Sequence, residues 1–260
     1  MTYTIKNFLD NDDIRIVDEK GPFQVIEYTR NLSIAPGEAM IAYFQSQMQV
    51  RRRQLVCTVG KHNVTTQRGA MQWTIGDVNA TTGIKSAGDL LKKTFRGAAT
   101  GESAIKPEYK GNGQLILEPT YKHILLLDLD DWNNHILIED GLYLASDSEV
   151  EQKAVAKKTL SSMTLGNEGL YNLGLKGTGV VALESQVPFE ELIQIELNND
   201  VLKIDGSMAI AWSASLDFTV ERSGKSLIGS AASGDGLVNV YRGTGTILLA
   251  PTVQTYTPII

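Results

Sequence analysis

The feature that most constrains this chain is a Gly-x-Gly pair that occurs three times at one interval. The pairs begin at Gly111, Gly177 and Gly243, so 66 residues separate each pair from the next. Each pair follows a Lys or Arg and leads into a mainly aliphatic run. A fixed interval of this kind is typical of a chain built from repeated structural units. The sequence therefore predicts three units of similar fold.

Each unit begins with the same local pattern. An alternating apolar run is followed by a cluster of Asn, Gly or Asp and then by a second apolar segment. Alternation on both sides of such a turn is typical of a β-hairpin. We therefore expect one hairpin in each unit, at residues 55–64, 125–136 and 193–201.

A short helix is expected between the hairpin and the Gly-x-Gly pair. In the first unit, Ser86 and Asp89 form a capping-box-like start to residues 90–96, and Gly97 follows. In the second unit, residues 148–151 similarly open a segment rich in Ala and Lys at 152–161. In the third unit, residues 223–230 are too short and glycine-rich for more than one turn.

Short strands with turn residues every 8–12 positions indicate an all-β fold with antiparallel sheets in a sandwich or barrel. We expect three β units, 50–120, 121–188 and 189–260, packed as one body around a pseudo-threefold axis. Residues 1–49 form a leader with strands expected at 23–29 and 39–44. Residues 39–44 are the longest apolar run in the sequence, and six residues are far short of the roughly 18 that span a membrane.

Three segments of the first unit resemble the signature of a known family. They are residues 88–97, the Gly-Glu-Ser at 101–103, and the Tyr-Lys-Gly-Asn-Gly at 109–113. Their order resembles the altered-inheritance-of-mitochondria (number twenty-four) family. That resemblance implies a fold like the trp RNA-binding attenuation protein, a short double-stranded β-helix type of sandwich in tandem copies. The family has no established catalytic residues, so the resemblance assigns none here.

Eukaryotic members of that family are tied to mitochondrial inner-membrane organisation. This chain has no basic, Ser/Arg-rich transit peptide, and its first 14 residues contain no basic and apolar secretory pattern. It is therefore similar to a bacterial, cytoplasmic member. Its single cysteine, Cys57, excludes an intramolecular disulfide.

The repeated glycines do not match a nucleotide-binding loop. A dinucleotide fingerprint needs a third glycine and a following helix, whereas each pair here leads into a strand. We interpret Gly-x-Gly as a strand kink or tight turn that glycine alone fits. Cys57 lies in an apolar strand, where a buried, inert thiol is expected.

Two sets of His, Asp and Glu residues are candidates for a metal-binding site. His123, Asp128, Asp130 and His135 contain ligand types, but the alternating aspartates are typical of an exposed strand face entering a turn. Glu102, Glu168 and Asp235 share one position in the repeat. They would either form a carboxylate ring that binds a cation or satisfy backbone donors at a corner, and we favour the second.

Two further groups have mainly structural interpretations. The run Arg51–Arg53 is expected on a solvated or edge strand, with a patch for an anionic partner as the alternative. His62 lies alone at the turn of the first unit. The tryptophans, Trp73, Trp132 and Trp212, are expected in core or rim packing.

The sequence favours a non-enzymatic interaction or scaffold protein that self-associates or binds another protein. The alternative is a β-sandwich protein that binds a small ligand or metal. RNA binding is a third hypothesis, by analogy of fold, but the net charge of −6 argues against it. We assign no catalytic, cofactor-binding or metal-binding residue, and we expect no nucleic acid partner and no membrane span.

Overall fold

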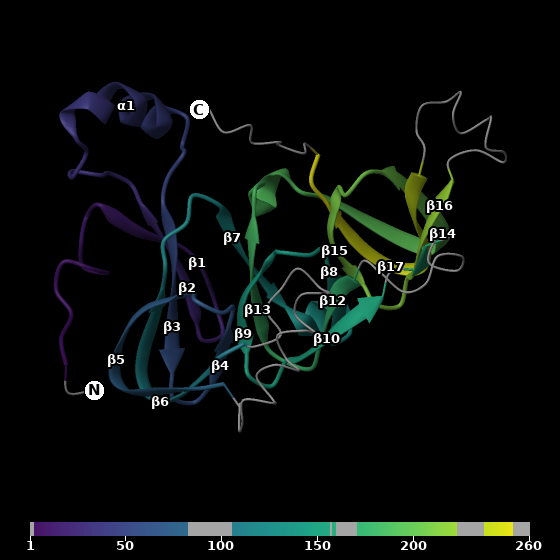
Figure 1. The fold of residues 1–260 in the computed structure, drawn as a ribbon, viewed down its shortest axis with the longest axis horizontal. Coiled ribbons are helices and arrows are strands. Elements are labelled where there is room, and N and C mark those ends of the chain that lie inside the picture. The colour runs from purple at the N-terminus through teal and green to yellow at the C-terminus, as the bar shows by residue number, and fades with distance from the viewer. Residues whose placement is uncertain (1–2, 83–105, 157, 160–170, 223–236, 252–260) are drawn as a thin grey trace.

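Two β-sheets make up the body of the protein in the computed structural model, which describes residues 3–82, 106–156, 158–159, 171–222 and 237–251 (Figure 1). Among the described residues every strand pair is antiparallel except β11 with β16. The predicted all-β class is confirmed. The helix expected at 90–96, the single turn at 223–230 and the Gly-Glu-Ser step at 101–103 lie outside the described residues.

The first sheet has nine strands, in the order β1-β2-β3-β6-β4-β9-β13-β7 with β5 beside β6. Their bounds are β1 (Ile14–Lys20), β2 (Phe23–Tyr28), β3 (Arg53–Val59), β4 (Val64–Thr66), β5 (Met71–Thr81), β6 (Glu108–Leu117), β7 (His123–Asp128), β9 (Tyr143–Asp147) and β13 (Val180–Ser185).

The second sheet has eight strands, in the order β10-β12-β8-β15-β17-β16-β11 with β14 beside β17. Their bounds are β8 (His135–Ile138), β10 (Glu151–Ala156), β11 (Lys158–Thr159), β12 (Tyr171–Lys176), β14 (Ile193–Asp205), β15 (Ala209–Ser213), β16 (Asp217–Arg222) and β17 (Leu237–Leu249). The helical elements are η1 (Pro36–Glu38), α1 (Ala39–Gln47), η2 (Leu129–Trp132) and η3 (Phe189–Glu191).

The Gly-x-Gly segments of the first and third units lie within the middle strand of their unit, and that of the second unit lies between two strands. In the first unit β6 lies between β3 and β4 on one side and β5 on the other. In the third unit β17 lies between β14 on one side and β15 and β16 on the other. In the second unit the middle strand is divided into β12 and β13, which belong to different sheets. The middle unit therefore contributes strands to both sheets.

The glycines are required where the middle strand bends. Gly111, Gly177 and Gly243 have φ values of 122°, 130° and 118°, which side chains other than hydrogen rarely allow. A Cβ on Gly111 would also overlap the carbonyl oxygen of Asp77. Gly177 starts the turn between β12 and β13, whereas Gly111 lies within a continuous strand. The interpretation of Gly-x-Gly as a kink or tight turn is confirmed.

The predicted hairpins are wrong in all three units. In the first unit β3 and β4 both pair with β6 and not with each other. In the second unit β7 and β8 enter different sheets. In the third unit the expected turn is only a bulge between Leu197 and Asp200 within β14. The local pattern located the strand segments, but contacts with distant strands determined how they pair.

Two other local predictions are also wrong. Residues 39–44 form the start of α1 rather than a strand, because Pro36 begins a helical turn that continues into residues without a period of two. Residues 152–156, expected in a helix at 152–161, belong to β10, which pairs with β12 along its whole length. Pairing with a neighbouring strand outweighs the helix propensity of Ala and Lys.

The first sheet curves until β1 approaches β7, where the Lys20 Nζ donates to the carbonyl oxygen of Leu126 at 3.3 Å. Its interior contains one apolar cluster that includes Phe23, Leu55 and Leu115. Along β7 the side chains alternate, with Leu126 in this cluster and Leu125 in a second cluster shared with the other sheet. Three strands of the middle unit, β7, β9 and β13, are therefore buried on both faces and join the two sheets through their cores.

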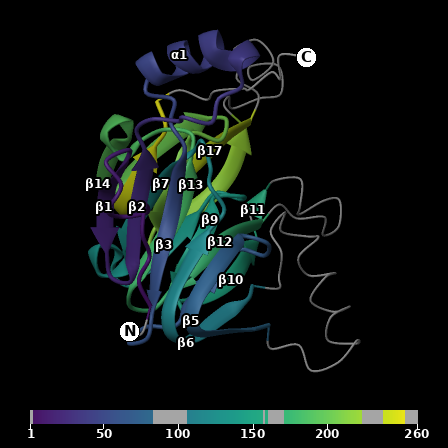
Figure 2. The same cartoon turned by 90° about the vertical axis from the view of Figure 1, so that its left-hand side faces the viewer.

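The nine-residue helix α1 lies beyond one end of the strands, and Figure 2 shows it crossing above β2 and β3. None of its residues is buried. Within the described residues, no helix is long and apolar enough to cross a membrane.

Candidate functional site

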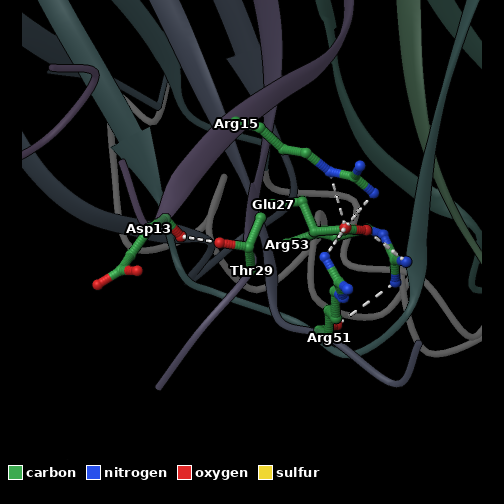
Figure 3. Close-up of polar contacts among 6 residues, drawn as sticks. All are labelled: Asp13, Arg15, Glu27, Thr29, Arg51 and Arg53. Atoms are coloured by element: carbon green, nitrogen blue, oxygen red, sulfur yellow. Dashed lines mark hydrogen bonds and ion pairs between the residues drawn. The ribbon is translucent and has the colours of Figure 1, made fainter. Parts of the chain in front are cut away.

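A buried carboxylate surrounded by arginines lies on the first sheet (Figure 3). The side chain of Glu27 is only 4% exposed and contacts Arg15 and Arg53 at 2.7 Å and Arg51 at 3.4 Å. Strand pairing determines this arrangement, because β2 lies between β1 and β3 and places Glu27 opposite both Arg15 and Arg53. Opposite charges in directly paired positions stabilise a sheet.

The expectation that Arg51–Arg53 lies on a solvated or edge strand is wrong. β3 lies between β2 and β6, and Arg53 is buried beside Glu27. Arg52 instead stacks on the ring of Tyr28, with its Cζ 5.5 Å from the ring centroid. The sequence signal for this cluster was Glu27 itself, the one charged residue in the apolar strand Phe23–Tyr28.

A groove of about 490 Å³ opens beside this cluster, between β1 and β7. Arg15, Glu27, Arg53, His123 and Glu190 are among the residues that line it. Burial, together with the charge of Arg53, lowers the pKa of His123, so its imidazole is neutral at pH 7. Arg51 does not line the groove, and the charged side chains that do line it balance, with Arg15, Lys20 and Arg53 against Asp18, Glu27 and Glu190.

The structure does not bring the proposed metal ligands together. His123 lines the groove, whereas Asp128 accepts a hydrogen bond from the Asp130 backbone N–H at 3.1 Å and caps η2. His135 begins β8 and lies beside β10. Among the described residues, no three His, Cys, Asp or Glu side chains are placed to hold a metal ion. The carboxylates Glu102, Glu168 and Asp235 lie outside the described residues.

His62 has a partner that the sequence did not suggest. Its Nδ1 lies 2.9 Å from Oδ1 of Asp147, at the end of β9 in the second unit. Asp147 also accepts a hydrogen bond from the backbone N–H of Val180 at 2.8 Å. Burial raises the pKa of the Asp147 carboxyl, and these two donors oppose the rise. The partners are 85 positions apart in the sequence, which explains why no local motif revealed the pair.

Two predictions about single side chains are confirmed. Cys57 is fully buried in the interior of the first sheet, and burial raises the pKa of its thiol, which makes it unreactive. Trp132 and Trp212 are buried, and Trp73 packs against Phe8 with ring centroids 5.5 Å apart.

A second candidate site is an apolar surface on and beside α1, which we call the helix surface. Its large side chains are 60–75% exposed, although they are apolar, and they are Leu32, Met40, Ile41, Tyr43, Phe44 and Met48. The segment 39–50 contains no charged residue. Contiguous exposed apolar residues of this size mark an interaction site in a folded protein.

These features define a class of protein, a two-sheet β protein assembled from repeated units with an exposed apolar helix. The sequence pattern of the family described as Mitochondrial biogenesis AIM24 matches residues 44–252, and the chain belongs to this family. The resemblance seen in the sequence is thereby confirmed.

A solved structure is also similar to this chain. It is the crystal structure of protein SPYM3_0169 from Streptococcus pyogenes, with 26% sequence identity and a TM-score of 0.57. The similarity covers 79% of this chain and 90% of the streptococcal chain. No protein with a curated function matches this chain.

Proposed function

We propose that this chain is a non-enzymatic interaction protein whose helix surface binds an apolar face of a protein partner. The single observation that supports the proposal is α1, a helix with no buried residue and several exposed large apolar side chains. Burying one such side chain contributes about 1.5–3 kcal/mol. A partner that covers the six residues of the helix surface would therefore gain several kcal/mol of binding free energy.

The charge of the helix favours a protein over a membrane surface. Helices that lie on membranes usually carry Lys or Arg on their polar face. The polar residues of α1, Gln45, Ser46 and Gln47, are uncharged. The net charge of −6 also argues against nucleic acid as the partner. A cytoplasmic location remains a prediction from the sequence.

The proposal is tested by comparing two double variants of the full chain. Ile41→Ser/Phe44→Ser removes two exposed apolar side chains, and Gln45→Ser/Gln47→Ser changes the same helix without removing apolar surface. We expect affinity purification to recover a protein partner with the native chain and with the glutamine variant. The apolar variant should lose that association while its unfolding midpoint stays near that of the glutamine variant.

A strictly monomeric native protein that recovers no partner would show that the proposal is wrong. Retention of the partner by the apolar variant would show that the helix surface is not the docking surface. The two results are distinct, because the first concerns association itself and the second concerns its location.

The exposed guanidinium of Arg15 supports a second candidate function, the binding of a small anionic ligand beside the groove between β1 and β7. Arg15 is the exposed member of the cluster, with 55% of its side chain accessible. We expect inorganic phosphate or pyrophosphate to raise the melting temperature above that in sodium chloride of equal ionic strength. Arg15→Gln should remove this difference, and an equal melting temperature in all three salts would contradict the hypothesis.

A further inference from the structure

The same pair of strands joins neighbouring units twice within the chain. β4 of the first unit pairs antiparallel with β9 of the second. β8 of the second unit pairs antiparallel with β15 of the third. β4 and β8 occupy equivalent places, since Val64 and Ile136 each lie five residues before a glycine, Gly69 or Gly141. β9 and β15 each follow the corresponding glycine of the next unit.

The two junctions also have nearly the same register. Val64 lies opposite Asp147, six residues after Gly141. Ile136 lies opposite Ser213, seven residues after Gly206. A bulge in β15 between Ala209 and Ala211 accompanies this one-residue difference. The chain thus repeats one specific strand junction between units.

A third junction of this kind would join the third unit to the first, but one chain does not make it. Its strands would be the second half of β14, Val201–Asp205, and the first half of β5, residues 71–76. Among the described residues β14 pairs only with β17 and β5 only with β6. β5 and β14 lie at opposite ends of the molecule (Figure 1). Each end therefore presents one half of a junction.

We propose that β14 of one copy pairs antiparallel with β5 of a second copy and so continues the junction between chains. The internal registers place Val201–Lys203 opposite residues 73–76 of the other copy. The inference extends the proposed interaction function to self-association, but it uses surfaces remote in sequence from α1. An edge strand with unpaired backbone groups is a ready template for another chain.

The side chains of the two edges are compatible. Residues 71–76 contain no charge, and Met71 and Val201 are 43% and 46% exposed. Lys203 would face Trp73 or Thr74, so no like charges meet. The backbone N–H of Val201 donates to Oδ1 of its neighbour Asp200 at 2.8 Å, a bond that a strand partner would replace. Joining different surfaces of two copies is heterologous and leads to a ring or filament.

Site-specific cross-linking tests the proposed pairing. Val201→Cys and Ile75→Cys are made separately in the full chain, where the native Cys57 is buried and inert. Opposite residues in an antiparallel pair have Cβ atoms about 4.5–5.5 Å apart, and a disulfide needs about 3.5–4.5 Å, so a shift of about 1 Å between the two edge strands allows the bond to form. We expect the mixed variants to form a disulfide-linked heterodimer under mild oxidation. In the control, Asn79→Cys in the other half of β5 replaces Ile75→Cys. It should give much less of the disulfide-linked heterodimer.

A charge exchange tests the same contact without a covalent bond. Thr74→Lys brings a second positive charge near Lys203, and should weaken association about 2–5-fold in sedimentation equilibrium. Thr74→Lys/Lys203→Glu should restore it, whereas Asn79→Lys should have little effect.

Three results would overturn the inference: a mass of 28.4 kDa at every concentration, equal cross-linking by Asn79→Cys, or no rescue by the charge exchange. The variant Ile41→Ser/Phe44→Ser should leave the cross-link unchanged. Failure of the helix surface and failure of the strand junction are therefore distinguishable.

Discussion

Neutralising Glu27 is the sharpest test of how the arginine cluster stabilises the first sheet. The substitution Glu27→Gln keeps the size of the side chain but removes the only carboxylate that contacts Arg51 and Arg53 among the described residues. Their side chains are only 16% and 9% exposed, so water cannot take over the role of the carboxylate. The variant would leave two largely buried guanidinium groups beside each other without a counter-charge.

The loss in free energy of unfolding that we expect for Glu27→Gln follows from the burial of Arg51 and Arg53. Removing one partner of a buried ion pair costs about 3–5 kcal/mol, because a buried charge is left uncompensated. Gln retains some hydrogen-bonding capacity, so we expect the lower end, about 3 kcal/mol. Arg15→Ala should cost less than about 1 kcal/mol, since its side chain is 55% exposed and surface ion pairs contribute little.

Urea unfolding followed by circular dichroism measures these differences as changes in the free energy of unfolding. Glu184→Gln is the matched control, because Glu184 contacts Lys122 at 2.7 Å but both side chains are more exposed, at 22% and 38%. A Glu27→Gln cost no larger than that of Glu184→Gln would refute the reasoning. It would mean that the arginines are stabilised by other groups or rearrange into water.

Three further predictions concern a glycine, a thiol and a carboxylate. Gly111→Ala should lower the free energy of unfolding by at least about 1–3 kcal/mol, since φ is 122° there, whereas Gly37→Ala should change it by under about 0.5 kcal/mol in the same assay. Cys57 should react with a thiol reagent only after unfolding, and reaction in native buffer would contradict its burial. Arg242 holds the pKa of Glu221 at about 2, below its ordinary 4.5. The stability contributed by the ionised Glu221 carboxylate is complete above pH 4.5 and is lost as the pH falls toward 2. The free energy of unfolding of Glu221→Gln should therefore fall less than that of the native chain over this range. Equal losses would contradict the prediction.

The class of fold was predictable from the sequence because the patterns that indicate it lie within short segments. Alternating residues identified the strand segments, and the equal spacing of Gly111, Gly177 and Gly243 identified the repeated middle strands. Each glycine is required by the backbone of its own segment. The buried thiol of Cys57 followed from the apolar strand around it.

Strand partners were not predictable in the same way. The same local pattern forms β3 and β4 of one sheet in the first unit. It forms β7 and β8 of different sheets in the second unit, and the single strand β14 in the third. The difference lies in which distant strand each segment pairs with. The contacts of Arg53 with Glu27 and of His62 with Asp147 join residues 26 and 85 positions apart, so no motif contains both partners. The candidate site therefore could be located only after the sheets were assembled.

The division of the middle strand at Gly177 explains both the joined sheets and the open ends. A strand that continues, as β6 and β17 do, keeps its whole unit within one sheet. The turn between β12 and β13 instead gives the second unit one half in each sheet, so each half can pair with a different neighbouring unit. That turn places the first and third units on separate sheets, and their complementary edges on β5 and β14 do not meet. A chain with this geometry can complete its third junction only with another copy of itself.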